Sequence, residues 1–173
     1  EIRRRTEELL DFCDLLKFRK RTVRKLSGGM KRKLMVCRAL LTDPEILLLD
    51  EPTAGMDALS RRQMWNLLRK LNGKNLTILL TTHYMEEAQS LCGRVALMDH
   101  GKLEEINTPS GLIDSLGKYT VDEMLPEETK SHYFHHRQEA IEFLSGLTGQ
   151  AALRETTLED VFVERAGRHL SPS

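Results

Sequence analysis

Three short sequences within residues 26–83 decide the fold: LSGGM at 26–30, ILLLDE at 46–51 and TILLTTH at 77–83. The first places a glycine pair before a helical pattern. The other two are apolar runs that end in carboxylates and in a histidine. Their order predicts alternating helices and parallel strands, with the polar groups gathered at one edge of a sheet.

The first sequence is suited to bind an anion at the start of a helix. Ser27, Gly28 and Gly29 are small, so they leave backbone N–H groups uncovered at the positive end of the helix dipole. An ordinary N-cap with a flexible loop is the alternative for this sequence taken alone, and the sequences downstream favour the phosphate site. We expect the helix to bury one stripe, made of Met30, Leu34, Cys37 and Leu41.

The second sequence predicts a buried strand that ends in two carboxylates. The run at 46–49 lacks polar alternation, as in a strand covered on both faces of a parallel sheet. Asp50 and Glu51 follow at its carboxyl end, where ligands bind in open α/β sheets. Because successive side chains point in different directions, one carboxylate can hold Mg²⁺ through water while the other polarises an attacking water.

The third sequence brings a histidine to the same edge of the sheet. A strand at 77–81 follows a helix whose apolar face holds Met64, Leu67, Leu68 and Leu71. His83 comes directly after this strand, where its imidazole can hydrogen-bond a terminal phosphate and the attacking water. A lone histidine is more often structural, and its place after two other phosphate-binding elements favours a catalytic role.

Together these residues resemble the nucleotide-binding domain of an ATP-binding cassette (ABC) transporter. LSGGM at 26–30 is similar to the family signature, which usually ends in Gln, and residues 46–50 resemble the Walker B strand. Glu51 matches the catalytic glutamate, AGMD at 54–57 resembles the D-loop, and His83 matches the switch histidine. Four motifs in this order within about sixty residues are a specific match, although any one alone would be weak.

The resemblance implies a head-to-tail dimer that hydrolyses Mg-ATP. ATP would lie between the Walker A loop of one subunit and residues 27–29 of the other. Glu51 would be the general base, His83 the γ-phosphate sensor, and Asp50 the residue that holds Mg²⁺ through water. Asp57 would lie at the dimer seam, and its role as a helix cap is an equally good interpretation.

The resemblance also implies the partners and the location. These are a second nucleotide-binding domain and membrane-spanning permease subunits, at the cytoplasmic face of the membrane. No apolar run approaches the roughly 20 residues that span a bilayer, and no signal peptide is visible, so membrane contact would come through a partner.

The charge balance, 26 basic against 26 acidic residues, gives no footprint for nucleic acid, and we expect none as a partner. Cys13, Cys37 and Cys92 lack metal-ligand spacing, which is typical of reduced cytosolic thiols.

The Walker A sequence G-x-x-x-x-G-K-[ST] does not occur in these 173 residues. Three Gly-Lys pairs are present, and none is followed by Ser or Thr. The chain therefore resembles the C-terminal portion of such a subunit, and we expect this stretch alone to be inactive as an ATPase. The partial sheet also predicts exposed edges.

Three parts are expected along the chain. Residues 1–43 would be the end of a helical subdomain with the signature helix, residues 44–117 the C-terminal half of the ATPase core, and residues 118–173 an accessory segment. The fold class is α/β, a partial P-loop NTPase-type three-layer core with a parallel sheet, plus a small α+β accessory segment. The first part contains a helix at 2–17 and a basic loop at 17–25, which we interpret as solvated, with steering of nucleotide phosphates as the alternative. Arg32 and Lys33 in the signature helix are also interpreted as solvated.

Sequence patterns predict the remaining elements less specifically. Helices are expected at 85–91, 109–117, 137–147 and 158–165, a hairpin of strands at 95–98 and 103–106, and a short strand at 151–154. TLEDVF at 157–162 resembles the ending of ABC ATPases of the drug-resistance and polysaccharide or antibiotic export type. His132, His135 and His136 could suggest a metal, but a polar surface or partner-facing cluster is favoured.

Two alternatives to a transport ATPase remain. One is a catalytically incompetent fragment that donates a signature surface in trans to another subunit. The other is a non-transport ABC ATPase of translation or DNA maintenance. It is disfavoured because such proteins usually carry a coiled-coil insertion or a second cassette, and neither is visible.

Overall fold

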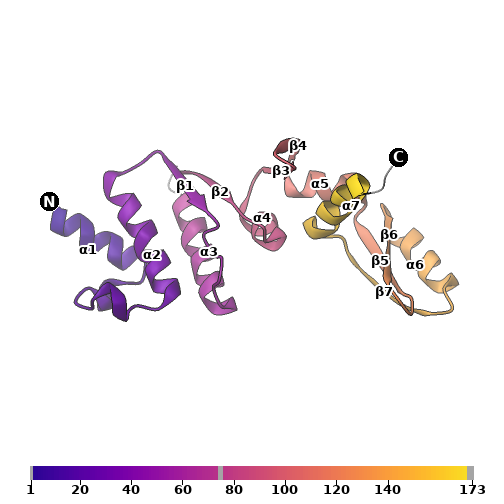
Figure 1. Cartoon of the computed structure of the whole chain (residues 1–173), viewed down its shortest axis with the longest axis horizontal. Coiled ribbons are helices and arrows are strands. Elements are labelled where there is room, and N and C mark those ends of the chain that lie inside the picture. The colour runs from indigo at the N-terminus through magenta and orange to yellow at the C-terminus, as the bar shows by residue number, and fades with distance from the viewer. Residues whose placement is uncertain (1, 74–75, 171–173) are drawn as a thin grey trace. The chain divides into compact units, whose positions relative to one another are not determined.

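The computed structural model describes residues 2–73 and 76–170, with side chains described as far as residue 165, and it divides into two compact units, residues 1–83 and 84–173 (Figure 1). The division into parts at 43/44 and 117/118 stays a prediction. Residues 171–173 of the expected accessory segment lie outside the described residues. No helix in the described part of the chain is long and apolar enough to cross a membrane.

Helices and a parallel strand pair alternate in residues 1–83, as the sequence predicts. The pair consists of β1 (Ile46–Asp50) and β2 (Thr77–Thr81), in register from Ile46 opposite Thr77 to Asp50 opposite Thr81. The carboxyl ends of both strands therefore lie at the same edge. The helical elements are α1 (Ile2–Phe12), η1 (Leu16–Phe18), η2 (Val23–Lys25), α2 (Gly28–Ala39), η3 (Leu40–Thr42) and α3 (Ala58–Asn72).

The predicted helix at 2–17 is wrong at its C-terminal end, because α1 stops at Phe12. Asp14 adopts a left-handed backbone with φ of 60°, and the Leu15 N–H donates to the Leu10 carbonyl at 2.7 Å. This is the six-to-one bond of a Schellman motif, which satisfies a carbonyl at the helix end.

The predicted buried stripe of α2 is only partly correct. Cys37 is buried, but Met30 and Leu34 are half-buried and Leu41 is 41% exposed. Lys33 is buried instead, so its interpretation as solvated was wrong. Its Nζ donates to Gln63 Oε1 at 3.2 Å and lies 3.9 Å from Asp14 Oδ2, and these partners offset the cost of burying the ammonium.

The core of residues 1–83 lies on one side of the strand pair. The predicted apolar face of α3 is confirmed, since Met64, Leu67, Leu68 and Leu71 are all buried. Leu47 of β1 is buried as well, but Ile46 and Leu48 are 60% and 70% exposed, and Leu79 of β2 is 64% exposed. The expectation that 46–49 is covered on both faces was therefore wrong, because in the described residues these strands pair only with each other and one face stays open.

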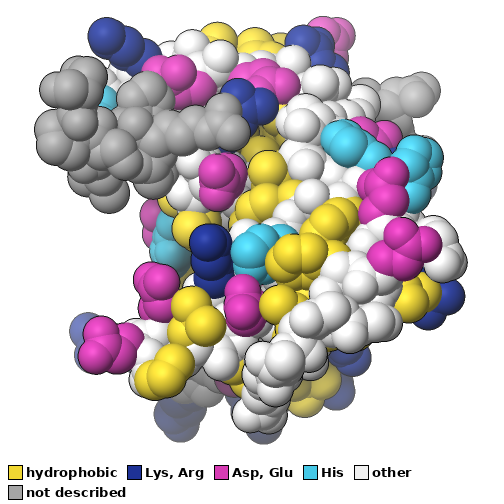
Figure 2. Space-filling view, turned by 90° about the vertical axis from the view of Figure 1, so that its right-hand side faces the viewer, with side chains coloured by type: hydrophobic (Ala, Val, Ile, Leu, Met, Phe, Trp, Pro, Cys, Tyr) yellow, Lys and Arg dark blue, Asp and Glu magenta, His cyan; other side chains and the backbone are white. Residues whose placement is uncertain are grey.

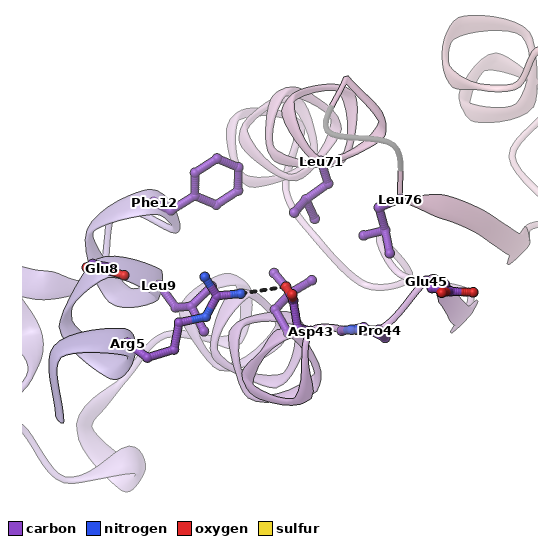
Figure 3. A pocket seen from close by; sticks show the side chains of 10 residues that line it. Arg5, Glu8, Leu9, Phe12, Asp43, Pro44, Glu45, Leu71 and Leu76 are labelled. Carbon is purple, nitrogen blue, oxygen red and sulfur yellow. Dashed lines mark hydrogen bonds and ion pairs between the residues drawn. The ribbon is translucent and has the colours of Figure 1, made fainter. Parts of the chain in front are cut away.

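A hollow of about 490 Å³ lies at the amino end of β1 (Figure 3). Arg5 of α1 reaches across it and donates to Asp43 Oδ1 at 2.7 Å, which ties α1 to the segment before β1. Leu71 and Leu76 point into it from the end of α3 and the start of β2. Because the predicted catalytic residues lie at the carboxyl end of β1, this hollow is not their site.

Residues 84–173 combine a hairpin, a three-stranded antiparallel sheet and four helices in the described residues. The predicted hairpin and the helices near 85–91, 109–117, 137–147 and 158–165 are confirmed, whereas strands β5 and β6 were not predicted. The sheet order is β6-β5-β7. The elements are α4 (Met85–Leu91), β3 (Val95–Asp99), β4 (Lys102–Asn107), α5 (Pro109–Leu116), β5 (Tyr119–Met124), β6 (Thr129–Phe134), α6 (Arg137–Gly146), β7 (Gln150–Glu155) and α7 (Leu158–Leu170).

The TLEDVF sequence has a structural role in this unit. Leu158 and Val161 of α7 are buried with Leu112 of α5 in one core. Thr157 caps the helix through the weak contact of its Oγ1 with the Asp160 N–H at 3.5 Å. Arg154 of β7 donates to Asp160 at 2.7 Å through each of two nitrogens.

Arg154 also joins the sheet to this helix, because its Nε donates to Asp122 Oδ2 of β5 at 2.6 Å. Burial alone would raise the pKa values of Asp122 and Asp160. Hydrogen bonds outweigh this effect and lower both pKa values. Asp122 accepts them from Arg154 and Ser131, and Asp160 from Arg154 and Thr157. The Asp160 hydrogen bonds in turn raise the pKa of Arg154. The polar groups of this network thus satisfy one another.

Of the three clustered histidines, His132 lies on a strand, whereas His135 and His136 follow that strand. His132 lies on β6, 22% exposed, with Nε2 3.0 Å from Glu123 Oε2 and its ring 4.5 Å from the Phe143 ring of α6. His132 is thus half-buried, whereas His135 and His136 are exposed, and a role of the three in a polar surface or partner-facing cluster stays a prediction. Figure 2 shows one face of the molecule, on which His side chains lie beside acidic and hydrophobic ones. No group of three or more metal-binding side chains occurs among the residues that the structure describes.

Candidate functional site: the carboxyl edge of the strand pair

The structure brings Glu51 and His83 into direct contact at the carboxyl edge of β1 and β2. Glu51 Oε1 lies 3.0 Å from His83 Nδ1, and the two side chains are 45% and 57% exposed. Glu51 has an unusual left-handed φ of 42°. Its N–H donates to the Thr81 carbonyl at 3.0 Å and contacts Thr81 Oγ1 at 3.2 Å, which fixes the backbone from which the carboxylate projects.

Asp50 is fixed by the same threonine. The Thr81 hydroxyl donates to Asp50 Oδ1, so β2 positions both carboxylates that end β1. The other oxygen, Oδ2, can face a ligand at the edge of the sheet. Carboxylate oxygens suit Mg²⁺, which binds through one or two carboxylates and keeps several waters, so Asp50 fits the predicted metal role.

The contact between His83 and Glu51 constrains the proton on the imidazole. An ionised carboxylate only accepts hydrogen bonds, so Nδ1 must carry the proton that it donates to Glu51. Nε2 is then an acceptor in the neutral ring and a donor in the imidazolium. A phosphate oxygen at Nε2 would accept a hydrogen bond only from a protonated nitrogen, whereas a water there can donate to an unprotonated one.

A hollow of about 530 Å³ opens beside these carboxylates. Asp50 and Glu51 line it from the sheet, and Arg32 and Arg38 line it from α2. Sequence reasoning treated Arg32 as merely solvated and did not single out Arg38. Helical spacing could have shown that Arg32 lines this hollow, because Arg32, Met35 and Ala39 lie three and four residues apart on the same face of α2.

The signature residues form a second cluster, at the start of α2. Ser27 caps the helix, its Oγ accepting from the Met30 N–H at 3.3 Å. An added Cβ at Gly28 would meet nothing within 4 Å, whereas one at Gly29 would lie 3.0 Å from Ser60 Oγ. Gly29 therefore permits α2 to approach α3 closely, and Gly28 leaves the helix N-terminus open.

Asp57 belongs to this second cluster through Ser60. It caps α3, with Oδ1 accepting from the Ser60 N–H at 2.9 Å and Oδ2 from the Ser60 hydroxyl at 2.7 Å. The Ser60 hydroxyl and then its N–H lower the pKa of Asp57. The structure thus gathers the predicted site residues into two clusters. Asp50, Glu51 and His83 lie beside Thr81. Gly29 and Asp57 lie beside Ser60, with Ser27 and Gly28 preceding Gly29 at the start of α2. Thr81 holds the first cluster together and Ser60 the second, and sequence reasoning assigned neither of them a role at the nucleotide site.

Comparison with known proteins shows the family to which the chain is related. A family model described as ABC transporter matches residues 1–54. The Nod factor export ATP-binding protein I of Cupriavidus pinatubonensis is 39% identical over 98% of this chain and 58% of its own length. The chain belongs to the ATP-binding domains of ABC transporters. The protein of the same name from Sinorhizobium fredii is 37% identical over 94% of this chain and 53% of its own length.

Solved ABC cassettes confirm the partial P-loop NTPase-type core. The structure of cbiO1 from Clostridium perfringens, described as part of the ABC transporter complex cbiONQ, has a TM-score of 0.60 and 26% identity, over 64% of this chain and 44% of that one. The dimeric bacterial ABC transporter cassette MJ0796 has a TM-score of 0.54 and 30% identity, over 61% and 46%. The ABC chain described here spans little more than half of the curated relatives' length.

Proposed function

We propose that this chain is the signature and Walker B portion of an ATP-binding and ATP-hydrolysing subunit of an ABC membrane transporter. The observation that supports it best is the contact of Glu51 with His83 at the end of β1, next to an Asp50 held by Thr81. A base, a phosphate-sensing imidazole and a Mg²⁺-compatible carboxylate thus share one edge.

In this proposal Glu51 orients and deprotonates the attacking water. Its carboxylate is exposed and held by His83, so it can accept a proton from a water that lies in line with the γ-phosphate. His83 keeps Nδ1 on Glu51 and contacts the γ-phosphate through Nε2. Asp50 would hold Mg²⁺ through water, and the metal would supply charge for the phosphate oxygens.

The signature cluster would complete a second ATP site in a head-to-tail dimer. The open N-terminus of α2 offers the Gly28 and Gly29 amides and the Ser27 hydroxyl to a phosphate on the partner subunit. Asp57 would lie at the seam. Closure on ATP would move permease subunits at the cytoplasmic face. The two Nod factor export proteins to which the chain is similar favour export as the direction of transport.

Glu51→Gln in the protein that carries this chain tests the catalytic role. The amide keeps the shape but cannot take a proton, so Mg-ATP turnover should fall about a hundredfold or more while ATP binding persists. Glu45→Gln, the same change in an exposed residue just before β1, should leave turnover unchanged. Equal turnover in both variants would contradict the proposal.

In the second candidate function, the chain supplies its signature residues to the ATP site of another subunit and Glu51 itself does not hydrolyse ATP. The open space around Gly28 supports this candidate. In that case Gly28→Asp would abolish turnover by the partner cassette, because a carboxylate repels phosphate. Glu51→Gln would then have no effect. Because both candidates predict a loss with Gly28→Asp, the effect of Glu51→Gln is what separates them.

A further inference from the structure

The charge of this neutral chain is strongly segregated. Residues 15–42 contain no Asp or Glu, yet they hold ten Lys and Arg residues. Of the ten, Lys33 is buried and Arg32 half-buried, and the others are exposed. The ten are Lys17, Arg19, Lys20, Arg21, Arg24, Lys25, Lys31, Arg32, Lys33 and Arg38.

Part of this charge surrounds an apolar groove of about 610 Å³ between α1, the loop with η1 and η2, and α2. Four of the cations line it, and no carboxylate does. They are Arg19, Arg21, Lys31 and Arg38. Arg19 also pairs with Glu7 at 3.0 Å, and Asp11 and Asp14 lie with Lys17 and Lys20 in a neighbouring hollow. Asp50 and Glu51 line the hollow that shares Met35 and Arg38 with the groove, so acidic groups border the groove without lining it.

Large aliphatic side chains stand exposed in the same groove. Val23 and Met35 are each 55% exposed and Leu41 is 41% exposed. Phe18 is the aromatic residue of the groove, and Lys17 and Arg21 lie over its ring at 5.1 and 4.9 Å. Sites for single-stranded nucleic acid combine cations with several aromatic faces on which successive bases stack, and the described residues of this groove include one aromatic ring, which two cations already cover. Exposed aliphatic side chains among cations suit the boundary between lipid headgroups and acyl chains instead.

We propose that this basic groove binds the surface of a bilayer that contains anionic lipid. The exposed cations contact headgroup phosphates, and Val23, Met35 and Leu41 enter the interfacial zone. Each cation near such a surface strengthens binding by about fivefold. This contact goes beyond the proposed ATPase function and does not require nucleotide.

Cosedimentation of the full chain with vesicles tests the proposal. We expect binding to phosphatidylcholine vesicles that contain phosphatidylglycerol, weak binding to phosphatidylcholine alone, and loss of binding at high salt because the attraction is screened. Equal binding to both vesicles would overturn the proposal. Binding of a single-stranded RNA or of polyglutamate without binding to either vesicle would also overturn it and identify another partner.

Charge neutralisation locates the surface. The variant Arg19→Gln/Arg21→Gln/Lys31→Gln should partition about a hundredfold more weakly, since three exposed cations of the groove are lost. Its matched control, Lys102→Gln/Lys130→Gln/Arg137→Gln, removes three exposed cations from residues 84–173 and should bind as the unchanged chain does. Trp65 fluorescence reports whether residues 1–83 remain folded. An equal loss of vesicle binding in both variants, with Trp65 fluorescence unchanged, would contradict the assignment of the binding surface to this groove.

A second pair of variants tests the apolar contribution. Val23→Ser should weaken vesicle binding a few-fold, whereas Val163→Ser, at a comparably exposed valine of α7, should not. If the two serine variants bind alike, then the groove does not enter the interface and the proposal fails in this respect.

Discussion

Polar side chains behave differently in the two units. In residues 1–83, Asp50, Glu51 and His83 stand exposed at the end of a strand pair whose other face is uncovered. In residues 84–173, Arg154 joins Asp122 and Asp160, and Thr120 bonds Thr156 in a buried pair. In the first unit these polar groups lie at the surface, where a ligand can bind to them. In the second unit the polar groups bond to one another and stabilise the fold.

The largest expected effect comes from truncating the closed core. Leu158→Ala should lower the free energy of unfolding of residues 84–173 by about 2 to 5 kcal/mol, because Leu158 is fully buried. Amide exchange in β5 measures this loss. Trp65 fluorescence should show little change in residues 1–83, and an equal loss there would show that the units unfold as one.

Removing the central cation of the polar network should have the next largest effect. Arg154→Met keeps much of the side-chain volume but strands two carboxylates that are 17% and 11% exposed. Because Arg154 itself is 37% exposed, solvent reduces the cost from that of a fully buried pair to about 2 kcal/mol. Urea unfolding followed by β5 exchange measures it, and an unchanged midpoint would mean that the network adds no stability.

The same network predicts an acid dependence. Asp122 and Asp160 have pKa values below their ordinary 3.8 in the folded chain, so the unfolded chain binds more protons. Their contribution is present above pH 3.8 and is lost as the pH falls through the lowered values. In Arg154→Met the carboxylates lose their partner, burial raises their pKa values, and stability should rise as the pH falls. The same acid dependence in both proteins would contradict this account.

The smallest stability effect is expected on the open face of the strand pair. Leu48→Ala should change the free energy of unfolding by less than about 0.5 kcal/mol, because Leu48 is 70% exposed. Trp65 fluorescence in urea measures this change. A loss of stability comparable to that of Leu158→Ala would show that this face of the strand pair is covered in solution. The contrast between an open first unit and a closed second unit would then fail.

The sequence predicted elements that follow local rules. β1, β2 and the apolar face of α3 follow from unbroken apolar runs and helical spacing, and the edge that carries Asp50, Glu51 and His83 follows from parallel pairing. Their roles in catalysis stay predictions, as do those of the signature residues and Asp57.

The elements that the sequence missed depend on distant partners. β5 has polar residues at positions that become buried or half-buried, and Thr120 and Asp122 find their partners in Thr156 and Arg154, more than thirty residues away. Lys33 is buried for a similar reason, since Gln63 lies on another helix. Short-range periodicity does not show such compensation.

Amide hydrogen exchange with and without a non-hydrolysable Mg-ATP analogue tests the difference between the units most directly. The measurement uses the protein that carries this chain. We predict slower exchange at residues 27–30, 50–57 and 81–83, and unchanged exchange at residues 119–134 and 150–160. Protection confined to the second set would contradict the assignment of the open polar edge as the nucleotide site.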